Sequence, residues 1–231
     1  MVWCALALAT TTRAHAQTPD YHGKLTVGLY DAGDVSSLDV NLRYSVGSWT
    51  GWVGDYRGDD HVRQSRGGVE YDLKRRWLFL APSIQAASGR FVGGSMYSEV
   101  GDRIYAIAGV SRTNLRPYVN LNFDPNDSWQ LGIGGHPRQA DAVALFTVWD
   151  NRLNTGQQIT HLIVRHRMER AQRVTVDVSY KSGHDDSGTY LTGTAEAIEY
   201  DRGRWFAKGA RDAHANFEAD TMWRLGAGVR F

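Results

Sequence analysis

The chain has 231 residues, with 26 Lys and Arg against 25 Asp and Glu, and one cysteine, Cys4. A charge this close to zero provides no basic surface for nucleic acid, so we expect no nucleic-acid partner. One cysteine cannot form an intramolecular disulfide. The longest apolar run is far shorter than the roughly 20 residues that a membrane-spanning helix needs.

The N-terminus has most of the pattern of an export signal. An apolar run over residues 2–9 is followed by Ala14-His15-Ala16, whose small first and third residues suit a signal peptidase. We therefore expect residues 1–16 to be a signal peptide and residues 17–231 to form a single domain. The pattern departs from a signal peptide in one respect, because no Lys or Arg precedes the apolar run.

Further along the chain, apolar residues recur with a period of two. In chain order they are Leu25, Val27, Leu29; Leu38, Val40, Leu42, Tyr44; Val119, Leu121, Phe123; Trp129, Leu131, Ile133; and Val174, Val176, Val178, Tyr180. This alternation places one face of a strand in an apolar medium and the other in a polar one. Three segments fit less well. Residues 77–81 and 142–149 are apolar on both faces, and residues 159–173 would also suit a helix.

Turn signals such as Gly33-Asp34 and Asp124-Pro125-Asn126-Asp127 separate these segments. With weaker signals included, turns recur roughly every 12 to 17 residues, as in membrane hairpins. Consecutive strands should then be antiparallel neighbours. Because single-chain bacterial barrels use an even number of strands, the sequence predicts an all-β barrel of about 14 strands, with 12 as the alternative. The short connections argue against large constriction loops.

Aromatic residues help to separate a transmembrane barrel from a soluble periplasmic sheet, which alternation alone leaves open. They lie near predicted strand ends, where their rings would settle at the two membrane interfaces. The residues concerned are Trp49, Trp52, Trp77, Tyr97, Trp129, Trp149, Tyr180, Tyr200, Trp205 and Trp223.

The last strand supplies a second indication. Its apolar face consists of Trp223, Leu225, Ala227, Val229 and Phe231. The segment resembles the terminal strand of bacterial outer-membrane proteins: Arg224 matches the polar position, Gly226 the glycine, and Val229 and Phe231 the two hydrophobic positions. The resemblance covers eight residues and names no narrower family. It implies an antiparallel transmembrane β-barrel in a Gram-negative outer membrane, with outer-membrane lipid and the barrel-assembly machinery as partners.

Polar residues on these strands should face the lumen of the barrel. The predicted lumen-facing residues are Asp39, Arg43, Arg66, Glu70, Asn120, Asn122, Arg165, Asp177, Glu196 and Arg224. Both signs of charge are present, so they would either orient a dipolar solute or pair across the lumen and close it. A barrel of this size is wider than the eight-stranded type that side chains fill. We therefore predict a porin-like channel for small polar solutes, with a closed structural barrel as an alternative.

A further alternative is an enzyme at the barrel rim acting on lipid or another envelope substrate. Its candidate residues are Ser95, Ser111, His136 and His161, but the chain contains no Gly-x-Ser-x-Gly elbow. His161 and His166, five residues apart, would point to opposite faces of a strand. His184-Asp185-Asp186 is typical of a solvated loop. The sequence predicts no catalytic residue, no metal site and no cofactor.

Overall fold

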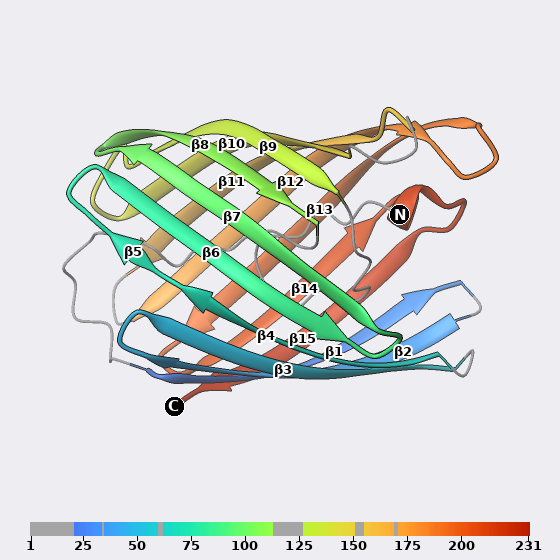
Figure 1. Cartoon of the computed structure of the whole chain (residues 1–231), viewed down its shortest axis with the longest axis horizontal. Helices are drawn as coiled ribbons and strands as arrows, with labels where there is room; N and C mark the ends of the chain where they lie inside the picture. Colours follow the sequence, from blue (N-terminus) through green and yellow to red (C-terminus); the bar gives the residue numbers. More distant parts are fainter. Residues whose placement is uncertain (1–20, 34, 60–61, 113–126, 151–154, 169–170) are drawn as a thin grey trace.

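The structure is a computed structural model that describes residues 21–231 except 34, 60–61, 113–126, 151–154 and 169–170. It is a closed β-barrel (Figure 1), and its elements have the following bounds. They are β1 Gly23–Ala32, β2 Val35–Val46, β3 Trp49–Gly58, β4 Arg63–Tyr71, β5 Leu73–Lys74, β6 Leu78–Ala87, β7 Phe91–Gly101, β8 Ile104–Ser111, β9 Ser128–Gly135, β10 Asp141–Asp150, β11 Gln158–Met168, β12 Gln172–His184, β13 Tyr190–Arg202, β14 Trp205–Asp212, β15 Met222–Arg230 and the 3-10 helix η1 Ala215–Phe217.

Two pairings close the sheet into a cylinder. β1 pairs with β15 from Lys24↔Arg230 to Asp31↔Trp223, and β4 pairs with β6 from Arg66↔Ala87 to Glu70↔Ser83. All the pairings are antiparallel, and the two-residue β5 is an extra strand beside β6. The barrel wall therefore has 14 strands, and the predicted fold class and strand number are confirmed. Closure leaves no unpaired edge, as a sheet in lipid requires.

The segment that would also suit a helix is a hairpin. β11 and β12 pair continuously from Gln158↔Ser182 to Met168↔Gln172. Along β11, buried His161, Ile163 and Arg165 alternate with exposed residues. Each side chain therefore has the environment of a strand. The described residues include no helix that is long and apolar enough to cross a membrane.

The two ends of the barrel differ in their connections. At the end that holds the C-terminus, here called the short-turn end, the strands are joined by tight turns at residues 47–48, 72–77, 102–103, 136–140 and 203–204. At the opposite end, here called the long-loop end, the β14–β15 connection spans residues 213–221. In barrels of this type the short turns lie in the periplasm.

The outer face is apolar and carries an aromatic belt near each end. Trp49, Trp77 and Trp205 are exposed near the short-turn end. Near the long-loop end, Trp129 stacks on Trp149 with ring centroids 4.1 Å apart, and Trp223 is exposed. Such belts mark the two membrane interfaces.

Two aromatic residues expected near the interfaces lie elsewhere. Trp52 is 6% exposed and Tyr97 is 4% exposed, and both lie on the inner face. The neighbours of Trp52 on β3, Gly51 and Val53, are exposed on the outer face. Because side chains alternate along a strand, the Trp52 ring points inward. For these two residues the sequence interpretation was wrong.

Glycines on the inner face let long side chains lie flat along the wall. A Cβ atom at Gly54 on β3 would be 3.0 Å from the amide nitrogen of Asn41 and 3.4 Å from the Arg66 guanidinium. The Arg66 side chain crosses β3 at this point, and its Nη2 donates to Asp39 Oδ1 at 2.6 Å. The lack of a side chain at Gly54 therefore makes room for an ion pair between strands that are not adjacent.

Substitution at Gly54 tests this packing. Gly54→Leu should displace Arg66 from Asp39 and lower the free energy of unfolding by about 3 kcal/mol, because one member of a buried ion pair is left uncompensated. Urea unfolding of the refolded barrel in lipid vesicles measures the change. Gly51→Leu on the outer face of the same strand, where nothing lies within 4 Å of the added Cβ, is the matched control. Equal unfolding midpoints for the two variants would contradict the packing argument.

Candidate functional site

The inner face of the barrel is the candidate site, and one sector of it is apolar. Side chains from β6, β7, β8, β10 and β11 form this cluster: Phe79, Ala81, Tyr97, Ile107, Phe146, Val148 and Ile163. It accounts for residues 77–81 and 142–149, which are apolar on both faces because they contact lipid outside and this cluster inside. The loss of alternation was the sequence signal for the apolar sector.

The remaining sector is charged, and its first ion pairs span β3. Asp39 on β2 accepts a hydrogen bond from Arg66 on β4, as described above. Arg43 and Glu70, on the same two strands, lie 3.6 Å apart. All four were predicted to face the lumen, and the structure places all four on the inner face. Burial of these charges is tolerated because each has an oppositely charged neighbour.

A second group of charges lies on β12, β13 and β15. Arg173 Nε donates to Asp201 at 2.8 Å, and Arg173 also lies 3.8 Å from Glu199. Arg230 lies 3.5 Å from Glu199 and contacts Asp201 as well. The sequence interpretation missed Glu199 and Asp201. The sequence signal for both residues is the alternation along β13. The apolar residues Ile198 and Tyr200 face outward, so Glu199 and Asp201 between and beside them face inward.

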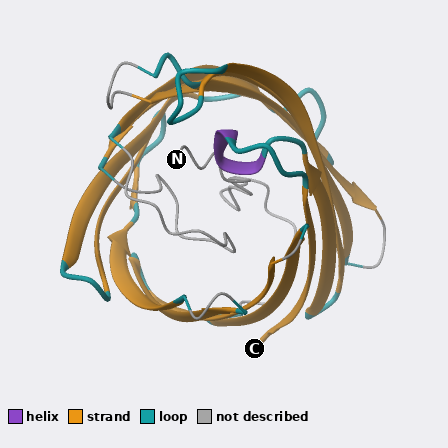
Figure 2. Cartoon of the chain, turned by 90° about the vertical axis from the view of Figure 1, so that its right-hand side faces the viewer, coloured by secondary structure: helices purple, strands orange, loops and turns teal. Residues whose placement is uncertain are grey.

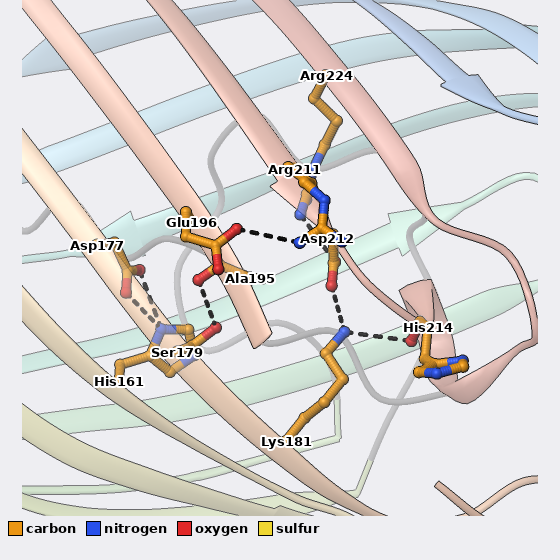
Figure 3. Close-up of polar contacts among 10 residues, drawn as sticks. All are labelled: His161, Asp177, Ser179, Lys181, Ala195, Glu196, Arg211, Asp212, His214 and Arg224. Atoms are coloured by element: carbon orange, nitrogen blue, oxygen red, sulfur yellow. Dashed lines mark hydrogen bonds and ion pairs between the residues drawn. The ribbon is translucent and has the colours of Figure 1, made fainter. Parts of the chain in front are cut away.

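Glu196 was predicted to face the lumen, but the structure places it on the outer face of the barrel. It shares the exposed face of β13 with Ile198 and Tyr200, not the inner face with Glu199. Its carboxylate lies 3.5 Å from Arg211 on β14, whose position is also on the outer face (Figure 3). The pairing satisfies both charges outside the lumen, so the predicted inward orientation of Glu196 is wrong.

The other predicted lumen residues have these positions. Arg165 and Asp177 are buried on the inner faces of β11 and β12, and Arg224 lies on the inner face of β15. Nδ1 of His161 is 2.9 Å from Asp177, and the His161 ring stacks on Phe146. Asn120 and Asn122, with the predicted strand around them, lie outside the described residues.

The Asp212 carboxylate forms ion pairs with two basic side chains at the long-loop end of the barrel. Arg224 Nη2 donates to Asp212 at 2.8 Å, and Lys181 contacts the other carboxylate oxygen (Figure 3). Lys181 also donates to the carbonyl oxygen of His214 at 3.2 Å. This cluster, here called the Asp212 cluster, links β12, β14 and β15 to the start of the β14–β15 loop.

The β14–β15 loop folds inward at this end of the barrel. Figure 2 shows η1 inside the ring of strands. Phe217 is 1% exposed and packs against Ile159 of β11, while Ala215 packs against Tyr30 of β1. Contacts to strands on both sides of the loop fix it in the mouth of the barrel. The short connections argued against large constriction loops, but this nine-residue loop is long enough to turn inside the barrel.

The residues considered for rim catalysis are spread around the barrel. Ser95 on β7 is hydrogen-bonded to Ser83, and Ser111 on β8 to Ser128. His136 lies in the β9–β10 turn against Tyr105, and His161 is on β11.

The β12–β13 turn contains the histidine and aspartates considered for cation binding. The hydroxyl of Ser187 and the backbone N–H groups of Ser187 and Thr189 donate to Asp185, and these hydrogen bonds lower the pKa of its carboxyl below the ordinary value. Nδ1 of His184 is 3.0 Å from the carbonyl oxygen of Thr155. Among the described residues, no group of three His, Cys, Asp or Glu side chains has the arrangement of a metal site.

Comparison with known proteins supplies structural neighbours. No protein-family model and no curated protein matches the chain. The Acinetobacter baumannii outer membrane protein Omp33 superposes with a TM-score of 0.61 at 10% identity, covering 93% of this chain and 100% of that one. The KdgM porin superposes with a TM-score of 0.51 at 10% identity, covering 90% of this chain and 99% of that one. The chain has the fold of a bacterial outer-membrane porin. The porin fold and the apolar outer face agree with the expected location in an outer membrane.

The Asp212 cluster yields a prediction about stability. Asp212→Asn leaves Lys181 and Arg224 without their shared carboxylate, so the free energy of unfolding should fall by about 3 kcal/mol. Urea titration in vesicles measures the loss. Glu196→Gln, which breaks the exposed pair with Arg211, should change stability by less than about 1 kcal/mol. A loss for Asp212→Asn no larger than that of the control would show that the cluster does not stabilise this end of the barrel.

Proposed function

We propose that the protein is a porin-like channel that carries small polar solutes across a bacterial outer membrane. The observation that carries the proposal is the inner face, where a charged, hydrogen-bonded sector lines a closed barrel whose outer face is apolar. A polar solute that enters such a lumen exchanges contacts with water for contacts with charged and polar side chains. The porin fold favours this function over a rim enzyme or a purely structural barrel.

The orientation of the long side chains supports a path through the lumen. Arg66 lies along the wall over Gly54, and the Lys208 side chain lies over Gly226, where an added Cβ would be 3.0 Å from it. Side chains that run along the wall occupy less of the cross-section than side chains that project from it. A KdgM porin structure of similar fold, with a TM-score of 0.50 at 9% identity, is described in complex with disordered oligogalacturonate. That complex supports passage of a polar solute here.

The sign of the inner charges suggests a selectivity. Within the described residues, the inward positions of the 14 wall strands hold ten basic residues, Lys24, Arg43, Arg66, Arg165, Arg167, Arg173, Lys181, Lys208, Arg224 and Arg230. They hold eight acidic residues, Asp39, Glu70, Glu99, Asp150, Asp177, Glu199, Asp201 and Asp212. A small cationic excess raises the local concentration of anions, so we propose a modest preference for anionic solutes.

Export and assembly complete the proposal. Residues 1–16 would act as the signal peptide. Arg224, Gly226, Val229 and Phe231 would present the last strand to the barrel-assembly machinery. In support, Phe231 and Gly23 exchange two backbone hydrogen bonds of 2.6 and 3.0 Å, which join the chain's last residue to the first strand.

Liposome swelling tests the proposed transport. Vesicles containing the refolded barrel should swell in isotonic solutions of small sugars, and faster with small organic anions than with cations of equal size. A reversal potential measured across a salt gradient should shift toward cation preference in Lys24→Glu, whose wild-type ammonium lies 4.5 Å from the Phe206 ring on the inner face. Arg57→Glu, on the outer face, should leave the reversal potential unchanged. Protein-containing vesicles that do not swell in any solute would refute the channel.

A further inference from the structure

A set of exposed arginines lies at the short-turn end of the barrel. Five of them lie in the turns between β5 and β6, β7 and β8, β9 and β10, and β13 and β14, and the sixth is the last residue of β13. The residues are Arg75, Arg76, Arg103, Arg138, Arg202 and Arg204. This set is here called the basic rim.

The arginines of the basic rim have no carboxylate within ion-pair distance among the described residues. At the long-loop end the pattern is reversed. Arg57 and Arg63 both pair with Asp55, Arg112 lies 3.8 Å from Asp127, and Arg211 pairs with Glu196. Four arginines at the long-loop end therefore pair with carboxylates of the chain itself, with exposed Arg90 as the exception, whereas none of the basic rim does so among the described residues.

Half of the basic rim adjoins the outward apolar surface. Arg76 precedes Trp77, Arg103 precedes Ile104 and Arg204 precedes Trp205, and these three neighbours are 60%, 70% and 59% exposed on the outer face. The Arg204 guanidinium lies 5.4 Å from the Trp205 ring centroid. These three arginines therefore lie next in the chain to outward residues at the short-turn end of the wall, where a membrane-spanning barrel meets the lipid head groups.

We propose that the basic rim is a binding surface for the phosphate groups of anionic phospholipids in the leaflet next to the short turns. Arginine suits this partner because its planar guanidinium donates two parallel hydrogen bonds to a phosphate. Aromatic side chains beside the arginines would contact the glycerol and upper acyl region of the same lipids. The surface is separate from the lumen, so the proposal does not depend on what the channel carries.

The test measures lipid retention by the intact, refolded barrel. The barrel is exposed to an equimolar mixture of phosphatidylglycerol and phosphatidylcholine in detergent, and bound lipids are counted by native mass spectrometry. The wild type should retain about tenfold more phosphatidylglycerol than phosphatidylcholine, because several arginines contribute at one surface. A variant with all six arginines replaced by glutamine should lose this preference. Arg57→Gln with Arg63→Gln, which removes exposed arginines from the long-loop end, should keep it.

Folding and alternative partners are controlled in the same experiment. Each variant is first shown to be folded by the faster gel migration of the unboiled sample. Equal retention of the two lipids by the wild type, or an unchanged preference in the six-residue variant, would overturn the proposal. It would also be overturned if the wild type showed no lipid preference and instead co-sedimented with peptidoglycan through the same arginines.

Discussion

The requirement that every backbone group be hydrogen-bonded in lipid determines the rest of this structure. A sheet in the membrane has no water to satisfy an open edge, so the strands must form a closed cylinder. The β1–β15 and β4–β6 pairings meet that requirement. Once the cylinder is closed, the two-residue repeat of each strand assigns its side chains to lipid or lumen. The apolar outer face, the aromatic belts and the charged inner sector all follow from closure and alternation together.

Charges in the lumen are stable because they are paired across the wall. Arg66 reaches Asp39 over Gly54, and Asp212 joins Lys181 to Arg224. The Arg66–Asp39 and Lys181–Asp212 contacts each connect two strands that are not hydrogen-bonded to one another, so they stiffen the cylinder as well as line it. From the sequence, the two signs of charge would either orient a dipolar solute or pair across the lumen. The structure shows acids and bases interleaved, with most of them on β1 to β4 and β11 to β15, and an apolar cluster on β6 to β11. A solute passing through such a lumen would meet charge on one side and apolar surface on the other.

Much of the fold could be predicted from the sequence, because alternation is a local property. Leu25, Val27 and Leu29 face outward as expected, and the strand number follows from turn spacing. The orientation of Glu196 could have been predicted, because Glu196 alternates in phase with the apolar residues Ile198 and Tyr200. The inward β14–β15 loop could not be predicted, because its path depends on distant partners such as Ile159 and Tyr30. The packing role of Gly54 could not be predicted either, because it depends on the path of the Arg66 side chain from another strand.

Single-channel recording tests whether the charged inner face lines a conducting path. Refolded wild-type barrel is added to a planar lipid bilayer in concentrated salt, and the current is followed at fixed voltage. If the lumen conducts, the recordings should show discrete, reproducible current steps with the folded protein and none with heat-denatured protein. Bilayers that contain folded, heat-modifiable barrel but show no current steps would contradict a conducting path, and would mean that the lumen is closed.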